Sequence, residues 1–124
     1  MDNQVSSDGL EQLRIRLAEF ADARDWDQFH APKNLAMALI AEAAELVEHF
    51  QWLTEAESRN LDQQQLDDVR LELADILIFL IRIADKLDVD LVQAARDKIV
   101  INEQRYPADW VRGLALRAEQ YRQE

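Results

Sequence analysis

The chain has 124 residues, 48% of them hydrophobic, which suits one domain with a buried core. Its formal net charge is −11, so we expect no binding to nucleic acid or to an anionic membrane surface. The absence of cysteine excludes disulfides and thiolate chemistry, and only two Gly and two Pro leave little material for β-turns, so the composition predicts an all-α protein.

The first predicted helix covers about residues 9–24. Asp8 and Glu11 have the spacing of a capping box, and apolar residues recur behind them at helical spacing. A connection rich in aromatic residues, DWDQFHAPKN, follows. Pro32 suits the first turn of a second helix, which we expect to run to about residue 53.

The polar segment TEAESRNLDQQQ (54–65) is expected to form a loop or a short helical turn. A third helix is predicted over about 63–87, with an apolar stripe at Leu66, Val69, Leu73, Ile76, Leu77 and Leu80. Asp90 is a candidate N-cap for a fourth helix, which should end near Arg105 because Pro107 follows.

Four helices with short connections predict an antiparallel four-helix bundle. We expect a single domain over 1–124, with its core at about 9–110 and a frayed or mobile tail at 111–124. The N-terminal residues lack the basic and apolar regions of a signal peptide, and no apolar run is long enough to cross a membrane. We therefore expect a cytoplasmic protein.

Two pairs of carboxylates stand inside apolar segments of the second and third predicted helices. Glu42 and Glu45 are three residues apart in the second helix, and Glu72 and Asp75 are three apart in the third. Residues at this spacing lie about 60° apart around a helix axis, so each pair shares one face. One such pair usually marks a solvated face, but two pairs inside apolar helices indicate a site that meets near the middle of an antiparallel bundle.

Carboxylates that meet in a low-dielectric site repel one another unless a cation is present. Oxygen ligands without a thiolate select Mg²⁺, Mn²⁺ or Ca²⁺, and Mg²⁺ leaves positions for water and substrate phosphates. A di-iron centre needs Glu-x-x-His on two helices, and His49 has the wrong offset from Glu45. We therefore expect Mg²⁺ as the cofactor, with Mn²⁺ as a substitute.

Polar residues of the fourth helix are candidates for substrate contacts. Lys98, Asn102 and Arg105 are spaced i, i+4 and i+7, which places them on one helix face, and Tyr106 follows directly. Two cations and an amide in a row suit phosphate oxygens or a sugar. The alternative is an ordinary solvated helix face.

Aromatic residues near the acidic pairs are candidates for stacking on a nucleobase. Trp26 and His30 precede the second helix, Trp52 lies seven residues after Glu45, and Phe79 lies four after Asp75. Each aromatic side chain taken alone is also compatible with core packing, and His30 with an exposed loop position.

With these residues, the sequence resembles the MazG-like all-α nucleoside triphosphate pyrophosphatases, and especially their dCTP pyrophosphatase branch. The signature of that family is E-x-x-E followed after a gap by E-x-x-D, which Glu42, Glu45, Glu72 and Asp75 match. The resemblance covers about residues 15–110, and its most specific segments are RDWDQFHAPKNLAMALIAEAAELVEHFQW (24–52), LADILIFL (73–80) and KIVINEQRYP (98–107).

The resemblance implies an enzyme that cleaves a nucleoside triphosphate between its α- and β-phosphates, with dCTP or a related pyrimidine dNTP preferred and removal of excess or modified nucleotides as its task. It implies Mg²⁺ on the four acids, one of which would activate water, with Glu45 as the first candidate beside Glu42. Further implied contacts are with phosphates or sugar (Lys98, Asn102, Arg105, Tyr106) and with the nucleoside (Trp26, His30, Trp52). Phe79 departs from relatives that often carry Tyr there, so its part in selectivity is open.

Two other functions fit the sequence. One is the same chemistry on another nucleotide, such as dUTP, a purine dNTP or phosphoribosyl-ATP. The other is a non-enzymatic acidic helical bundle that binds a partner protein. A short four-helix unit with an open site buries more surface by self-association. The resemblance implies dimers or dimers of dimers, so we expect a homodimer or homotetramer.

Overall fold

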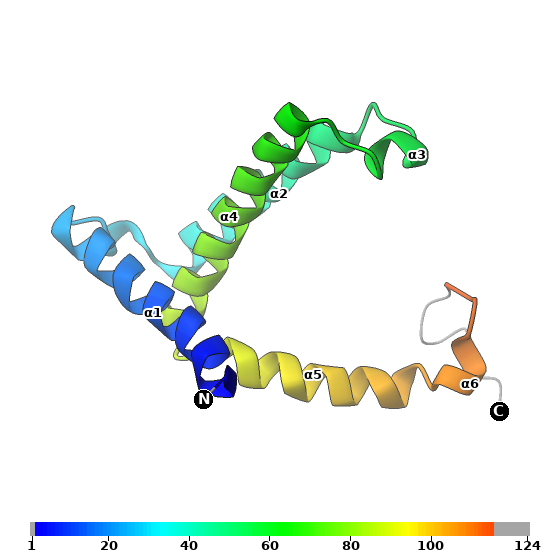
Figure 1. Cartoon of the computed structure of the whole chain (residues 1–124). Coiled ribbons are helices and arrows are strands. Elements are labelled where there is room, and N and C mark those ends of the chain that lie inside the picture. Colours follow the sequence, from blue (N-terminus) through cyan, green and yellow to red (C-terminus); the bar gives the residue numbers. More distant parts are fainter. Residues whose placement is uncertain (1, 116–124) are drawn as a thin grey trace. The chain divides into compact units, whose positions relative to one another are not determined.

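The computed structural model of the chain describes residues 2–115, with side chains from residue 9 onward (Figure 1). The described residues form helices and no strands, which confirms the all-α class. In chain order the elements are α1 (Asp2–Ala23), η1 (Asp27–Phe29), α2 (Pro32–Phe50), α3 (Glu55–Ser58), α4 (Gln63–Lys86), α5 (Leu91–Arg105) and α6 (Ala108–Val111). Within the described part of the chain, no helix is long and apolar enough to cross a membrane.

The chain divides into two compact units. The first ends at Val89 and contains three of the four long helices, α1, α2 and α4, while the second begins at Asp90 and contains α5 and α6. The prediction of four major helices is confirmed. The prediction that they form one bundle in a single domain stays a prediction.

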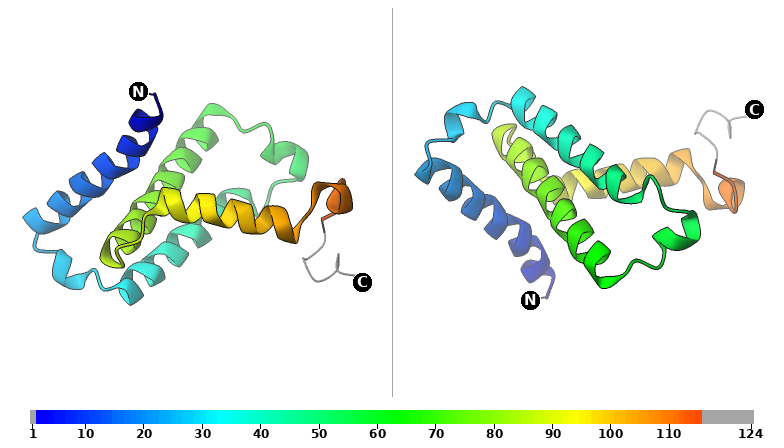
Figure 2. Two further views of the ribbon diagram at one scale, coloured as in Figure 1. Left: turned by 90° about the horizontal axis from the view of Figure 1, so that it is seen from below. Right: turned by 90° about the horizontal axis from the view of Figure 1, so that it is seen from above.

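In the first unit, α2 and α4 lie side by side and run in opposite directions, joined by the segment that contains α3 (Figures 1 and 2). Pro32 occupies the first turn of α2, where its missing N–H has no intrahelical partner to lose. Helix α1 contacts α4. The buried apolar side chains of the described residues come from all three helices and are Ala21, Leu35, Val69, Ile81 and Ala84.

Side-chain caps fix where several helices begin. Thr54 and Glu57 form a capping box at the start of α3, and Asp62 and Gln65 form another at the start of α4. In the α4 box, Asp62 accepts from the Gln65 backbone N–H at 2.8 Å, and Gln65 accepts from the Asp62 N–H at 2.9 Å. Asp90 accepts from the Gln93 N–H at 3.0 Å, which confirms the predicted N-cap of α5.

The predicted start of the first helix is wrong. Helix α1 begins at Asp2 and continues through Asp8 and Gly9, so Asp8 is an interior helix position. One Gly inside a helix costs only about 1 kcal/mol, and none of the preceding residues is a proline that would stop the helix. The second helix ends at Phe50, three residues before the predicted end. The predicted tail lies mostly outside the described residues, which end at residue 115.

The predicted apolar stripe of α4 is not the buried face in this unit. Only Val69 of the stripe is buried, while Leu66, Leu73, Leu77 and Leu80 are exposed. The buried residues of α4 are Val69, Glu72, Ile81, Arg82 and Ala84. Their burial follows from the contacts of α4 with α2 and α1. Local hydrophobic periodicity does not specify these contacts, so within this unit most of the leucines of the stripe are exposed.

Candidate metal centre

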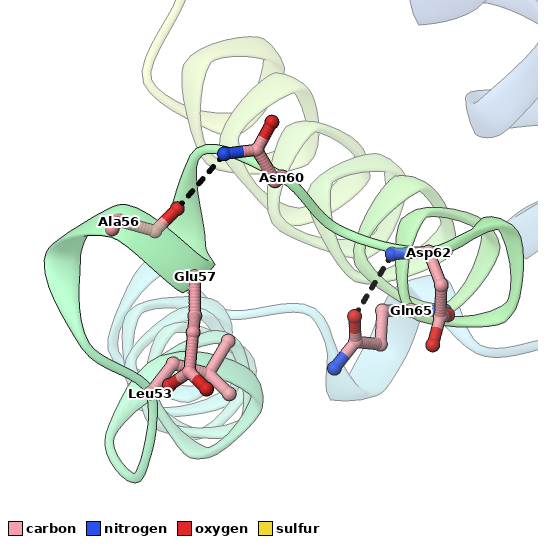
Figure 3. Close-up of a pocket in the computed structure, with 6 residues that line it drawn as sticks. All are labelled: Leu53, Ala56, Glu57, Asn60, Asp62 and Gln65. Carbon is pink, nitrogen blue, oxygen red and sulfur yellow. Dashed lines mark hydrogen bonds between the residues drawn. The ribbon is translucent and has the colours of Figure 1, made fainter.

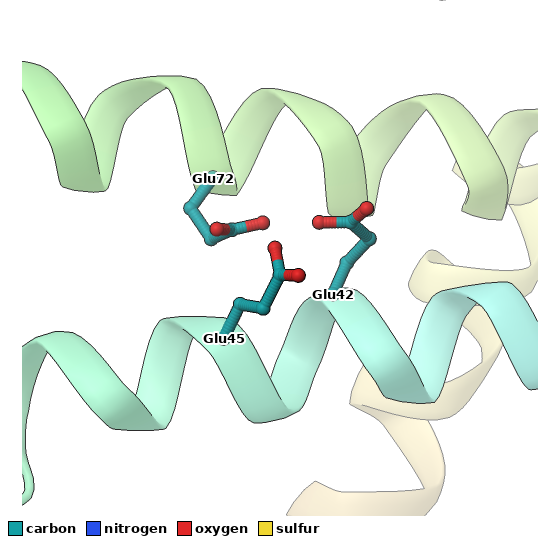
Figure 4. Close-up of side chains that lie close together, drawn as sticks. All are labelled: Glu42, Glu45 and Glu72. Carbon is teal, nitrogen blue, oxygen red and sulfur yellow. The ribbon is translucent and has the colours of Figure 1, made fainter.

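Three of the four predicted acidic ligands meet between the two helices of the hairpin. Glu42 and Glu45 project from α2 and Glu72 from α4, and their carboxylates point toward one another (Figure 4). One oxygen of each lies within 4.8 Å of the others. The spacing of three residues puts the two α2 carboxylates on one face, and the antiparallel partner brings Glu72 opposite them.

The site places negative charge where water has limited access. Glu72 is only 8% exposed and Glu42 is half-buried. Oxygen Oε2 of each is buried and accepts no hydrogen bond from the described residues. The pKa of Glu42 is raised above its usual value, first by the neighbouring carboxyl of Glu72, then by burial, and further by the charge of Asp75.

This arrangement fits a hard divalent cation. An octahedral Mg²⁺ has oxygen ligands at about 2.1 Å, so opposite ligands lie about 4.2 Å apart, close to the spread of the three carboxylate oxygens. Within the part of the chain that the structure describes, the buried Oε2 atoms of Glu42 and Glu72 have no hydrogen-bond partner, and a cation would supply one. Carboxylate ligands without thiolates favour Mg²⁺ or Mn²⁺ over softer metals.

Asp75, the fourth predicted ligand, is not part of the three-carboxylate group. It follows Glu72 by three residues on α4, is exposed, and acts on Glu42 through its charge. Its role as a ligand stays a prediction.

His49 lies beside the acidic group, although its spacing from Glu45 does not match a di-iron motif. Its Nε2 lies 3.8 Å from Oε1 of Glu72. His49 follows Glu45 by four residues on α2, so it extends the same helix face toward α4. The spacing that excluded a di-iron motif is the spacing that places this imidazole beside the acidic group.

The aromatic residues that are predicted to contact the nucleoside lie at separate places in the first unit. Trp26 is 46% exposed and packs edge-on against Phe20 at 5.8 Å between ring centres. Trp52, just beyond the end of α2, is 86% exposed. Phe79 is half-buried on α4. Exposed indole faces are available for stacking on a planar ligand.

His30 is held by a buried arginine, Arg82, that no sequence motif indicates. Arg82 of α4 is 3% exposed and donates to His30 and Asp27 of the connection before α2, and to Asp85 on its own helix. Asp85 also accepts from Arg14 of α1 at 3.0 Å. The only sequence signal was a charged residue inside the apolar run LIRIA. This network ties the connection to α4 and α1.

The remaining predicted substrate contacts lie in the second unit. Lys98, Asn102 and Arg105 are on the helix α5, which confirms their placement on one face, and Tyr106 caps its C-terminal end. Lys98 and Arg105 are exposed. The guanidinium carbon of Arg105 lies 5.6 Å from the centre of the Tyr106 ring, within the range of a cation–π contact.

An open pocket of about 430 Å³ lies beside α3 (Figure 3) and is lined by Leu53, Ala56, Glu57, Asn60, Asp62 and Gln65. Its polar side chains are engaged locally. Glu57 and Gln65 complete the two capping boxes, and Asn60 donates to the carbonyl of Ala56 at 3.1 Å. The pocket contains none of the acidic-centre residues, so its polar groups serve the turn rather than a metal.

Comparison with known proteins finds several similar sequences. The chain is 44% identical over 110 residues to dCTP pyrophosphatase 1 of Rattus norvegicus, and 44% identical over 105 residues to dCTP pyrophosphatase 1 of Homo sapiens. The matches cover 87% and 83% of this chain. The chain spans only 65% and 62% of the length of these two relatives.

A solved structure shares the fold. The crystal structure of a pyrophosphatase from Archaeoglobus fulgidus matches with a TM-score of 0.76 and 37% identity, over 80% of this chain and 93% of that one. The model of the MazG-like family matches residues 38–117, which include all four predicted acidic ligands. The chain therefore belongs to the MazG-like family, as its paired acidic motifs predicted.

Proposed function

We propose that the protein is a Mg²⁺-dependent nucleoside triphosphate pyrophosphatase that converts a pyrimidine deoxynucleotide, dCTP first, to the monophosphate and pyrophosphate. The observation that carries the proposal is the group Glu42, Glu45 and Glu72, in which one buried oxygen each of Glu42 and Glu72 has no partner among the described residues. The name dCTP pyrophosphatase 1 of relatives about 44% identical supports the choice of substrate. The biological task would be the removal of excess or modified dNTPs.

The acidic residues would hold the cation and activate water. Glu42, Glu45, Glu72 and Asp75 are the proposed ligands, and a bound Mg²⁺ would neutralise the triphosphate and polarise the scissile P–O bond. Glu45 is the most exposed member of the three-carboxylate group, so it is the best candidate to accept the proton of the attacking water. The water oxygen would bond to one phosphorus of the α–β linkage while the bridging oxygen leaves that phosphorus from the opposite side. The products are the monophosphate and pyrophosphate.

Other side chains would bind the rest of the nucleotide. The proposed contacts with phosphates or sugar are Lys98, Asn102, Arg105 and Tyr106, and those with the nucleoside are Trp26, His30, Trp52 and Phe79. Two exposed cations would locally offset the net charge of −11, which otherwise repels a triphosphate. Phe79 offers a ring surface without a hydroxyl donor.

We also propose that the enzyme is a cytoplasmic homo-oligomer, a dimer or a tetramer. Large apolar side chains remain exposed on the three long helices of the first unit, including Leu13, Ile40 and Leu73. An apolar surface of this extent on a small helical unit is typical of a subunit interface.

The substrate is tested by pyrophosphate release across a panel of dNTPs and NTPs, with Mg²⁺ or with EDTA. We expect hydrolysis only with Mg²⁺, fastest for dCTP or a close pyrimidine relative. The variant Glu45→Gln should lose most of the activity, whereas Glu48→Gln, exposed on the same helix and outside the group, should retain it. No pyrophosphate from any nucleotide, in a folded protein with Mg²⁺ present, would refute the proposal.

A further inference from the structure

The guanidinium of Arg82 makes an unusual pair of contacts with one atom of His30. Both Nε and Nη2 of Arg82 lie 3.2 Å from Nδ1 of the imidazole. Nη2 also donates to Asp27 at 3.0 Å, and Nη1 donates to Asp85 at 3.2 Å. The arginine is 3% exposed, so its end of these part-buried bonds has little contact with water.

These contacts define the protonation state of the ring. An arginine has N–H donors and no acceptor, so Nδ1 of His30 must accept. A neutral imidazole whose Nδ1 is an acceptor carries its proton on Nε2. A proton on Nδ1 would instead face the N–H groups of a buried cation.

The charged groups around the ring favour the same state. Lys86 and Arg82, both on α4, bond to the same carboxylate oxygen of Asp27, so the charge of Asp27 is offset by two cations. Asp85 is bonded to Arg82 and Arg14. Burial and then the charge of Arg82 lower the pKa of His30, against a smaller opposite effect of Asp27.

The other ring nitrogen is available to a ligand. His30 is only partly buried, and Nε2 makes no hydrogen bond with another residue in the described part of the chain. An N–H of fixed orientation on a partly exposed ring selects an acceptor atom, because a donor placed opposite it would leave both groups unpaired.

We propose that Arg82 is a positioning residue that locks His30 in its neutral Nε2–H form, so that His30 gives the bound nucleotide a fixed hydrogen-bond donor. The partner would be an acceptor atom, either on the nucleobase or on the sugar and phosphates. His30 then contributes to binding and selectivity and does not transfer a proton. The assignment of a nucleotide as ligand rests on the proposed function, whereas the lock itself does not.

The lock is tested first without any nucleotide. In ¹⁵N NMR spectra of the full chain, we expect Nδ1 of His30 to resonate as an unprotonated nitrogen and Nε2 as a protonated one at about pH 7. His49 is the only other histidine, so the spectrum of His30→Asn assigns the signals. A proton on Nδ1, or a charged ring at this pH, would overturn the lock whether or not the protein is an enzyme.

The part played by Arg82 is tested by two substitutions. Arg82→Met removes every donor, and we expect mixed tautomers and a higher pKa for His30. Arg82→Lys keeps one donor and should largely restore the wild-type form. An unchanged His30 spectrum in folded Arg82→Met would show that Arg82 does not set the tautomer. If Arg82→Met does not fold, a proton on Nδ1 of the wild type still overturns the proposal, and Arg82→Ala and Arg82→Gln replace Arg82→Met as the test of the arginine.

The donor role is tested by two matched variants of His30 itself. The side chain of Asn keeps an acceptor near the position of Nδ1 but has no outward donor, whereas Gln places an amide N–H near the position of Nε2. For dCTP we expect KM to rise about tenfold in His30→Asn, with kcat nearly unchanged, and to recover most of that loss in His30→Gln. An unchanged KM in folded His30→Asn, or equal losses in both variants, would exclude the donor role.

The same assay separates the two sources of the acceptor. If the acceptor is on the base, the loss in His30→Asn differs between pyrimidine and purine dNTPs. If it is a sugar or phosphate oxygen, the loss is equal for all bases. If the wild type hydrolyses no nucleotide, the proposed function fails while the NMR result on the lock still stands.

Discussion

Glu72 is the residue whose environment most strongly requires a cation. It is the least exposed of the three clustered carboxylates, and its Oε2 is buried without a partner among the described residues. A buried carboxylate beside two others is destabilising unless it is protonated or neutralised by an ion. The free energy of unfolding should therefore increase when the cation binds.

We expect Mg²⁺ to raise the melting temperature of the wild type and to have little effect on Glu72→Gln. At a Mg²⁺ concentration about 100 times the dissociation constant, binding to the folded state adds about 2.7 kcal/mol to the free energy of unfolding. Thermal unfolding followed by circular dichroism, with Mg²⁺ or EDTA, measures the effect. Glu48→Gln is the matched control, and a similar Mg²⁺ shift in all three proteins would contradict the site.

The acidic cluster was predictable from sequence, whereas the Arg82 network was not. Three carboxylates were identifiable in the sequence, Glu42, Glu45 and Glu72, because carboxylates inside apolar helices are destabilising unless a cation neutralises them. The partners of Arg82 are far away in the chain, 52 residues for His30 and 55 for Asp27. No local periodicity encodes such pairs, since they depend on how the connection folds over the end of α4.

The connection before α2 is attached to α4 through two titratable side chains, His30 and Asp27. Because the pKa of His30 is lowered from 6.5, the unfolded chain binds more protons than the folded one between the lowered value and 6.5. Stability due to His30 is thus fully present above 6.5 and is lost as pH falls through this window. The lowered pKa of Asp27 affects stability in a separate pH range, because its contribution is lost only as pH falls below the usual value of 3.8.

We expect the free energy of unfolding of the wild type to fall more between about pH 7.5 and pH 5.5 than that of His30→Asn, which has no imidazole to titrate. Urea unfolding at both pH values measures it. The acidic cluster is identical in both proteins, so its own pH dependence cancels in the difference. An equal fall in the two proteins would show that His30 is not held neutral.

The start of α4 depends on its capping box. Asp62→Ala removes the side-chain acceptor for the Gln65 N–H and should lower the free energy of unfolding by about 1 kcal/mol. Asp62→Asn keeps an acceptor and should cost much less. Urea unfolding of the two variants tests the cap, and equal losses would mean that the charge rather than the cap is responsible.

The helices themselves were well predicted by apolar spacing and end signals, and their packing less well. The bounds of α4 and the cap of α5 agree with the prediction because they depend on neighbouring residues. The predicted start of α1 was wrong because the capping-box pattern at Asp8 expresses only a local preference. Most of the apolar stripe of α4 is exposed in the first unit, because contacts with α1 and α2 determine which of its faces is buried.

For the molecule as a whole, the uncovered apolar surface is the main indication of self-association. Among described residues, five apolar side chains are buried, and the exposed ones include Met37, Ile40, Leu71 and Leu73. A soluble monomer seldom exposes so much apolar surface. We expect light scattering at micromolar concentration to give a homodimer or homotetramer, and a monomer there would contradict this expectation.

The most direct test of the central claim is the Mg²⁺-dependent release of pyrophosphate from dCTP by wild type, Glu72→Gln and Glu48→Gln. We predict dCMP and pyrophosphate in equal amounts from the wild type and from Glu48→Gln, with EDTA abolishing both, and a loss of at least about 100-fold in Glu72→Gln, the range seen when one catalytic electrostatic contact is removed. Full activity in Glu72→Gln, or in EDTA, would show that the acidic group between α2 and α4 is not the catalytic metal centre.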